Sequence, residues 1–139
     1  MLQDLGIKNV MIPTDDPYES WDNKRRHGMA ILSIRHAGYI AGLGKLGKNN
    51  LLINNKFGNM IQIGAILADY EFDYDEIATY EVCPENCKIC LKSCPEAALD
   101  GSTVNQNKCR ELSNFRTEKG YILKKCWKCR SSCPNATGL

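Results

Sequence analysis

The sequence predicts an α+β protein in two parts: a small N-terminal α/β segment that contains a β-hairpin, and a C-terminal part that folds around metal. All eight cysteines lie after residue 82 of the 139-residue chain, whereas apolar residues before residue 70 follow strand and helix spacings. Between these regions, residues 69–85 contain seven acidic residues and no Lys or Arg, which marks a boundary. We therefore expect one unit at residues 1–70 and a second at residues 71–139.

The N-terminal unit is expected to contain a strand, a helix and a hairpin. Residues 6–14 have the composition of a strand, which Asp15-Asp16-Pro17 interrupts. Residues 29–43 carry apolar and small side chains at helical spacing and end in glycines, which predicts a helix. Residues 51–53 and 60–67 flank a turn rich in Asn and Gly, so we expect these two runs to pair as a β-hairpin.

The C-terminal unit contains a cysteine pattern that occurs twice. The copies are Cys83-x3-Cys87-x2-Cys90-x3-Cys94-Pro95 and Cys109-x16-Cys126-x2-Cys129-x3-Cys133-Pro134. Both end in Cys-x3-Cys-Pro, as in the bacterial ferredoxin run, where three cysteines bind one [4Fe–4S] cube and the fourth binds the other cube. We therefore expect a dicluster ferredoxin-like domain with short helices after Cys87, around residues 109–115 and after Cys126.

Crossed ligation assigns every cysteine to one of two clusters. The first set is Cys83, Cys87, Cys90 and Cys133, and the second set is Cys109, Cys126, Cys129 and Cys94. Zinc is the main alternative, because four-cysteine zinc sites also begin with Cys-x2-Cys, but zinc gives no reason for two Cys-x3-Cys-Pro endings. Disulfides are less favoured still, since the first ten residues lack the pattern of a secretory signal and we expect a cytoplasmic, reducing location.

The charge distribution is more informative than the formal net charge of +2. Residues 88–130 hold ten basic residues against four acidic ones, and Lys124, Lys125, Lys128 and Arg130 surround the second cysteine triplet. Such cations could dock an anionic partner, including a redox partner protein that donates electrons, or could only offset the negative charge of bound clusters. No run of residues is long and apolar enough to cross a membrane.

A glycine-rich loop, GLGKLGKNN at residues 42–50, lies between the expected helix and hairpin. It matches two phosphate-binding patterns by spelling, G-x-G-x-x-G and G-x4-G-K. Both patterns require a strand before the loop and a helix after it, and the order here is the reverse. In addition, Asn49 replaces the Ser or Thr that holds magnesium in a P-loop. We therefore do not expect nucleotide binding.

The extended loop, AGLGKLGKNNLLI at residues 41–53, and the double cysteine pattern that follows it resemble the epoxyqueuosine reductase family. The resemblance covers residues 33–134. It implies a partial reductase-like region at 1–70, two [4Fe–4S] clusters and cobalamin, which together reduce an epoxide on a modified base of transfer RNA; related corrinoid enzymes dehalogenate organohalides. On this basis the candidate cofactor-binding residues are Gly42, Gly44, Gly47, Lys48 and Asn49, and tRNA is a candidate partner.

Three departures from the family pattern leave the catalytic residues unknown. The larger N-terminal region of the family is mostly missing, and Lys45 replaces a tryptophan. The family has a catalytic acidic residue and a Glu-Arg pair before the glycine loop. In this sequence Gly28 stands at the position of the acid, Ile34 at that of the glutamate and Arg35 at that of the arginine. Other polar residues precede the loop, and we expect turn, cap or packing roles for them: Asp15, Asp16, Asp22, His27 and His36.

Two functions follow from these observations. One is a subunit or shortened member of a corrinoid reductase, with a separate N-terminal subunit or a second copy completing the site. The other is a stand-alone electron carrier that resembles a dicluster ferredoxin; purely structural clusters are a third reading. A carrier needs only the C-terminal unit and has no evident use for residues 29–67, which favours the reductase.

Overall fold

The computed structural model describes residues 2–14 and 19–139. The N-terminal elements are η1 (Gln3–Leu5), β1 (Asn9–Ile12), β2 (Ser20–Asp22), β3 (His27–Met29), α1 (Ile34–Ile40), β4 (Lys45–Leu46), β5 (Leu52–Ile53) and β6 (Ala65–Ala68). The C-terminal elements are α2 (Ile89–Ser93), α3 (Gln106–Ser113), β7 (Asn114–Arg116), β8 (Ile122–Lys124) and α4 (Lys128–Ser131). Small helices combined with short antiparallel strands confirm the predicted α+β class.

The named strands of the described residues pair in four antiparallel ribbons, β1–β6, β2–β3, β4–β5 and β7–β8. The predicted hairpin between residues 51–53 and 60–67 is therefore wrong. The intervening turn closes on itself, because Asn54 and Gly58 exchange two backbone hydrogen bonds of 2.9 and 2.8 Å. The next residue, Asn59, donates its N–H to the C-terminal segment, to the carbonyl of Asn135 at 3.2 Å, so β6 leaves in another direction and pairs with β1.

The predicted helices are present but shorter than the apolar spacing suggested. Helix α1 covers the middle of the predicted range 29–43. Met29 at the start of that range belongs to β3, and Gly42 follows the helix in a left-handed conformation, φ 74°. The N–H of Leu43 then bonds to the carbonyl of Gly38 at 2.9 Å, as in a Schellman motif. Helices α2, α3 and α4 lie where the cysteine pattern placed them, and the β7–β8 hairpin fills the long spacing between Cys109 and Cys126.

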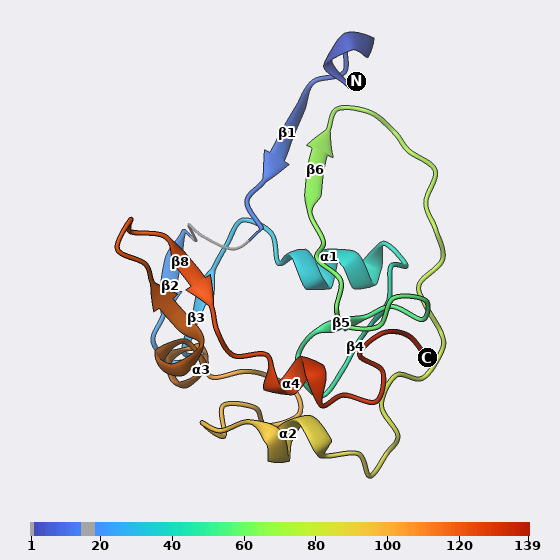
Figure 1. Cartoon of the computed structure of the whole chain (residues 1–139). Helices are drawn as coiled ribbons and strands as arrows, with labels where there is room; N and C mark the ends of the chain where they lie inside the picture. Colours follow the sequence, from blue (N-terminus) through green and yellow to red (C-terminus); the bar gives the residue numbers. More distant parts are fainter. Residues whose placement is uncertain (1, 15–18) are drawn as a thin grey trace.

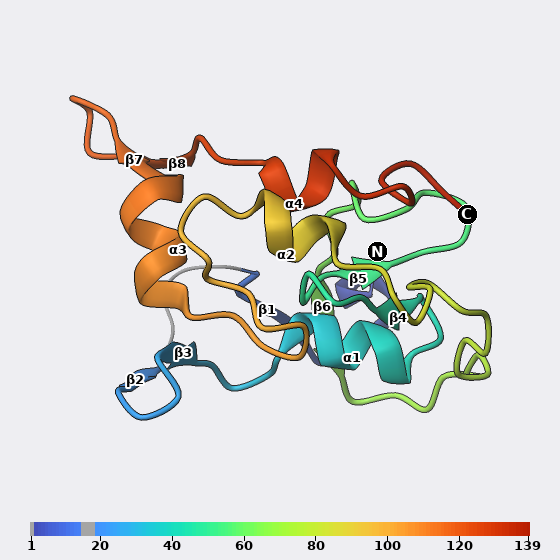
Figure 2. The same ribbon diagram turned by 90° about the horizontal axis from the view of Figure 1, so that it is seen from below.

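The elements are arranged in succession from one end of the molecule to the other (Figure 1). The β1–β6 ribbon lies at one end, α1 with β4 and β5 lies in the middle, and α2 and α4 lie side by side at the other end, as Figure 2 also shows. The buried apolar residues of the described chain are few: Ile12, Leu52, Ile53, Val82, Cys90 and Ala98. Because so small a core stabilises little, we expect bound metal to supply much of the stability.

Candidate metal centres

The two Cys-x2-Cys turns adopt the same backbone conformation. Lys88 and Trp127 occupy the equivalent position before α2 and α4, with φ and ψ of −132° and 18° in one and −126° and 10° in the other. Ser93 and Ser132, each directly before the last cysteine of its motif, contact each other through hydroxyl oxygens 2.8 Å apart. The sequence repeat is thus also a structural repeat, and its two copies meet face to face through α2 and α4.

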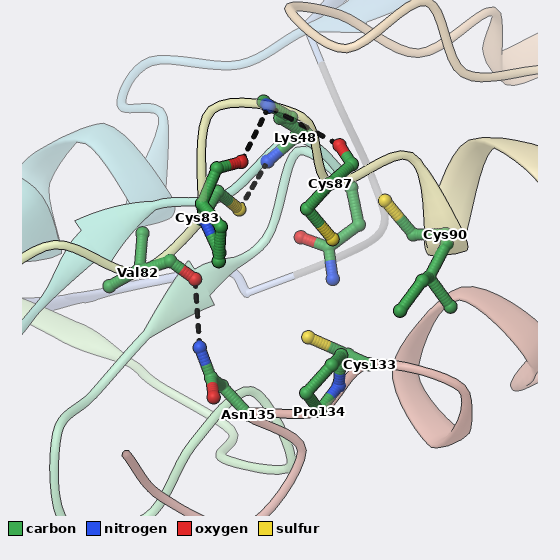
Figure 3. A pocket seen from close by; sticks show the side chains of 11 residues that line it. Lys48, Val82, Cys83, Cys87, Cys90, Cys133, Pro134 and Asn135 are labelled. Atoms are coloured by element: carbon green, nitrogen blue, oxygen red, sulfur yellow. Dashed lines mark hydrogen bonds between the residues drawn. The ribbon is translucent and has the colours of Figure 1, made fainter.

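The first group of thiols lines one cavity of about 80 Å³. Its cysteines are Cys83, Cys87, Cys90 and Cys133. Figure 3 shows Cys133 facing the other three, although it comes from the second motif. Burial raises the pKa of Cys90, and repulsion from Cys83, Cys133 and Cys87 raises it further. Four thiolates in this space therefore require a cationic group between them.

The second group of thiols surrounds Cys129. Burial raises the pKa of Cys129 most, the charges of Cys109, Cys126 and Cys94 raise it further, and Arg130 opposes them. Cys94 comes from the first motif, so each motif contributes one thiol to the other group. This membership is the one that crossed ligation of two clusters requires.

A single zinc ion and an iron–sulfur cluster can both take four thiolates, but they require different distances between the sulfurs. Among the residues that the structure describes, no three His, Cys, Asp or Glu side chains converge closely enough to hold one metal ion. A tetrahedral zinc site with Zn–S bonds of about 2.3 Å needs sulfur atoms roughly 3.8 Å apart. A cube binds each thiolate through a different iron and so needs a wider arrangement. Four thiols in each group also match the number of protein ligands that a [4Fe–4S] cluster takes.

Backbone N–H groups point at two of these sulfurs. The N–H of Lys48 donates to Sγ of Cys83 at 3.4 Å, and the N–H of Ala98 donates to Sγ of Cys94 at 3.3 Å. Hydrogen bonds of this kind stabilise thiolate charge and help to set the reduction potential of a cluster. Each group of thiols contains one of these two sulfurs.

The three candidate glycines pack against their own chain. A Cβ atom on Gly42 would lie 2.4 Å from the carbonyl oxygen of Glu76, and one on Gly44 would lie 2.4 Å from that of Ile53. A Cβ on Gly47 would lie 2.5 Å from Cδ1 of Ile53. Close approach within the chain explains why these three positions are glycine, so their lack of a side chain is not evidence of a cradle for cobalamin.

The other two candidate residues of this loop turn toward the thiols. Lys48 and Asn49 both line the first cavity. The buried Asn49 amide donates to the carbonyl of Cys129 at 3.2 Å, and its oxygen accepts the N–H of Leu51 at 3.2 Å. Lys48 and Asn49 therefore connect the N-terminal unit to both groups of thiols.

Sequence reasoning missed several polar residues that join segments far apart in the sequence. Asn135 donates from Nδ2 to the carbonyl of Val82 at 2.8 Å, beside the first group (Figure 3). Arg130 donates to the carbonyls of Asn59 and Ile61, and burial lowers its pKa. The paired serines before Cys94 and Cys133 were visible in both motif copies, whereas bonds to backbone carbonyls leave no trace in a sequence.

The other polar candidates make local contacts or lie apart. Asp22 accepts the N–H of Arg25 at 2.9 Å, which is the expected turn role, and Nδ1 of His36 lies 2.6 Å from the Ser33 hydroxyl on an exposed helix face. His27 pairs with Asp22 across the β2–β3 hairpin. Arg35 is partly buried, with a lowered pKa and no hydrogen-bond partner for Nε. Asp15 and Asp16 lie outside the described residues.

Comparisons with known proteins relate the chain to reductases. No protein-family model matches it. It is 32% identical over 121 residues to the epoxyqueuosine reductase of Staphylococcus aureus, a match that covers 78% of this chain and 31% of that protein. It is 34% identical over 89 residues to a tetrachloroethene reductive dehalogenase of Desulfitobacterium hafniense, which covers 59% of this chain and 16% of the dehalogenase.

Solved structures show the same fold. The epoxyqueuosine reductase of Bacillus subtilis matches 99% of this chain and 36% of its own length, with a TM-score of 0.66 at 21% identity. An epoxyqueuosine reductase in complex with an epoxyqueuosine-modified tRNA stem loop matches 97% of this chain and 36% of its own, also with a TM-score of 0.66, at 20% identity.

The fold and the two groups of thiols define an iron–sulfur protein of the oxidoreductase class. More closely, the chain is a member of an epoxyqueuosine reductase-like family, as the resemblance predicted, and it shares its cysteine-rich region with reductive dehalogenases. The chain spans about a third of the length of the curated epoxyqueuosine reductase that it matches at 32% identity. None of its described helices has the length and apolarity to cross a membrane.

Proposed function

We propose that this chain is the electron-relay part of an epoxyqueuosine reductase-like oxidoreductase and binds two [4Fe–4S] clusters. The observation that supports this most is the crossed membership of the two groups of thiols, Cys83, Cys87, Cys90 and Cys133, and Cys94, Cys109, Cys126 and Cys129. Such clusters supply one-electron transfer when bound. The protein contributes the thiolates, the N–H donors to sulfur and, for the first group, a partly enclosed cavity.

Electrons enter this relay at the second group. Cys126 borders a surface hollow of about 350 Å³ that Trp127, Lys125 and Lys128 also line, and the Trp127 side chain is 51% exposed. A thiol at an exposed, positively charged face suits an acidic electron-donor protein, because opposite charges speed the encounter. The first group adjoins Lys48 and Asn49 of the glycine loop, which supports an inner position for this group in the relay.

The acceptor of the electrons lies beyond the described residues. Cobalamin is the acceptor that the family resemblance implies, but the three glycines of the loop are explained by packing against their own chain and do not by themselves support a cofactor site. In this proposal the acceptor site includes residues outside those that the structure describes, and a separate N-terminal subunit and a second copy of this chain are two candidates to supply them. Transfer RNA is a substrate of the assembled reductase in this proposal, in line with the relative solved with a tRNA stem loop.

A stand-alone dicluster carrier is the second candidate function. The observation that favours it is the absence of the family's acidic residues at two positions before the glycine loop, where Gly28 and Ile34 stand. Gly28 lies in β3 and donates its N–H to the Gln106 side chain at 3.1 Å, a contact between the units and not a proton-donor site. A carrier would need no further polypeptide and would bind no cobalt.

Elemental analysis for iron, zinc and cobalt tests both proposals. The protein is purified without oxygen from cells that are supplied with cobalamin. About eight irons per chain support two clusters, and cobalt in addition supports the reductase, whereas its absence favours the carrier. Zinc in place of iron would overturn the redox function.

A further inference from the structure

One lysine of the glycine loop holds the first cysteine loop at several points. The ammonium of Lys48 donates to the carbonyls of Pro84, Glu85 and Cys87, with distances of 3.0, 2.5 and 3.2 Å. The backbone N–H of the same residue donates to Sγ of Cys83 at 3.4 Å. Figure 3 shows Lys48 directly against this loop. Lys48 thus binds both ends of the segment between Cys83 and Cys87.

These contacts use the full hydrogen-bonding capacity of the side chain. A lysine ammonium has three donors and no acceptor, and the loop carbonyls provide three partners. The bonds are charge-assisted and hence stronger than those between neutral groups. An ammonium that is saturated in this way has no donor left for the phosphate of an RNA backbone or of a corrinoid tail.

The unusual spacing of the first motif explains why such an anchor is needed. The segment between Cys83 and Cys87 has one residue more than the ferredoxin run, so it has an extra carbonyl to satisfy and one more residue to order. Three carbonyl dipoles that point to one place repel each other unless a cation lies between them. The second motif has no such short segment, since its first cysteine lies in α3.

We infer that Lys48 is a positioning residue for the first iron–sulfur cluster: it fixes the loop from Cys83 to Cys87, and its charge raises the reduction potential of that cluster. This inference rests on the proposed function. The fixed positive charge beside the group stabilises the more negative, reduced form, so its removal lowers the potential. The sequence had suggested cofactor binding for Lys48, and the structure assigns it to the protein's own thiol loop.

The test compares Lys48→Met with Lys45→Met in the holo-protein. Lys45 lies in the same glycine loop, but its ammonium pairs with the exposed Glu81 carboxylate at 2.9 Å, and such exposed pairs stabilise little. Iron release to a chelator and the midpoint potential of each cluster are measured. We expect Lys48→Met to release about half of the iron about tenfold faster and to lower one potential. Lys45→Met should match the unaltered protein in both measurements.

Further outcomes separate the inference from the proposed function. If Lys48→Met cannot be isolated, Lys48→Arg takes its place; its planar guanidinium keeps the charge but cannot serve three converging carbonyls equally, so faster release with a nearly unchanged potential is expected. If the unaltered protein holds two clusters and the Lys48→Met variant has the same rate of iron release and the same potentials, only the inference about Lys48 is overturned. Unaltered protein without iron–sulfur clusters would overturn the proposed function instead.

Discussion

At the scale of single residues, the crossing of the two motifs is the most specific feature of the chain. Cys133 faces Cys83, Cys87 and Cys90, while Cys94 belongs with Cys129. We expect Cys133→Ser to damage the first cluster and Cys94→Ser to damage the second, because serine is a poor ligand for iron in such a site. Iron content and the electron paramagnetic resonance spectrum of each reduced variant identify the cluster that is lost. Damage confined to each variant's own motif would contradict crossed ligation.

A second test at this scale asks whether the glycines of the loop serve packing or cofactor binding. A Cβ on Gly44 would lie 2.4 Å from the carbonyl oxygen of Ile53, whereas one on Gly64 would meet only Thr14 at 3.6 Å. We expect Gly44→Ala to lower the free energy of unfolding by about 1–3 kcal/mol, and Gly64→Ala to change it by less than about 0.5 kcal/mol. Denaturant unfolding of the holo-protein measures both. Equal stability of the two variants would count against the packing role.

Residue roles could be predicted from the sequence only where spacing determines them. The grouping of the cysteines follows from the doubled motif, and the structure brings the same thiols together. The partners of Lys48 are backbone carbonyls, which any residue type provides, so nothing in the sequence identifies them. The role of the glycines could not be predicted either, because close packing against Ile53 and binding of a ligand both require a residue without a side chain.

At the scale of elements, the basic residues around the start of α4 are expected to control the rate of electron entry. Lys125 and Lys128 line the hollow beside Cys126 and Trp127. Replacing both lysines by Glu should slow reduction by an acidic donor protein about tenfold at low ionic strength, because attraction becomes repulsion. Rapid-mixing kinetics over a range of salt concentrations measure this effect.

The matched control for this element is Lys56→Glu. Lys56 is exposed in the turn after β5, with its ammonium 5.2 Å from the centre of the Phe57 ring, and it does not line the hollow beside Cys126. Reversal of this one charge, which is half of the charge change in the double variant, should leave the rate nearly unchanged. A similar decrease in both variants would indicate a general effect of net charge and would remove the case for a specific donor face.

Elements were predictable from the sequence where local signals decide them. Helices α2 and α4 end before a Cys-Pro pair, and α1 ends at glycines, as spacing and composition indicated. Strand pairing was not predictable in this way. The runs that form β5 and β6 are both apolar and flank a good turn, but β6 pairs with β1, more than fifty residues away in the sequence. Contacts of Asn59 and its neighbours with the C-terminal segment direct the chain there.

At the scale of the whole molecule, contacts cross the boundary predicted at residue 70. Gln106 accepts from Gly28 through its side chain and donates its N–H to the carbonyl of Arg26 at 3.0 Å. Asn49 and Arg130 make further bonds between the two regions. The acidic segment between them runs along one side of the molecule from β6 to α2 (Figure 1). The composition shift at this boundary therefore does not separate two independent sets of contacts.

Removal of the metal should consequently unfold more than the cysteine-rich region. The described core has few buried apolar side chains, and two of these, Val82 and Cys90, line the cavity of the first thiol group. Without a cluster the cysteines of the loop from Cys83 to Cys87 no longer bind iron, so the loop loses its order and Lys48 and Asn49 lose ordered hydrogen-bond partners. We expect anaerobic chelation to abolish amide protection in α1 and β5 as well as in α2 and α4. Hydrogen exchange before and after chelation measures this, and protection that persists in α1 and β5 would show that residues 1–70 fold independently.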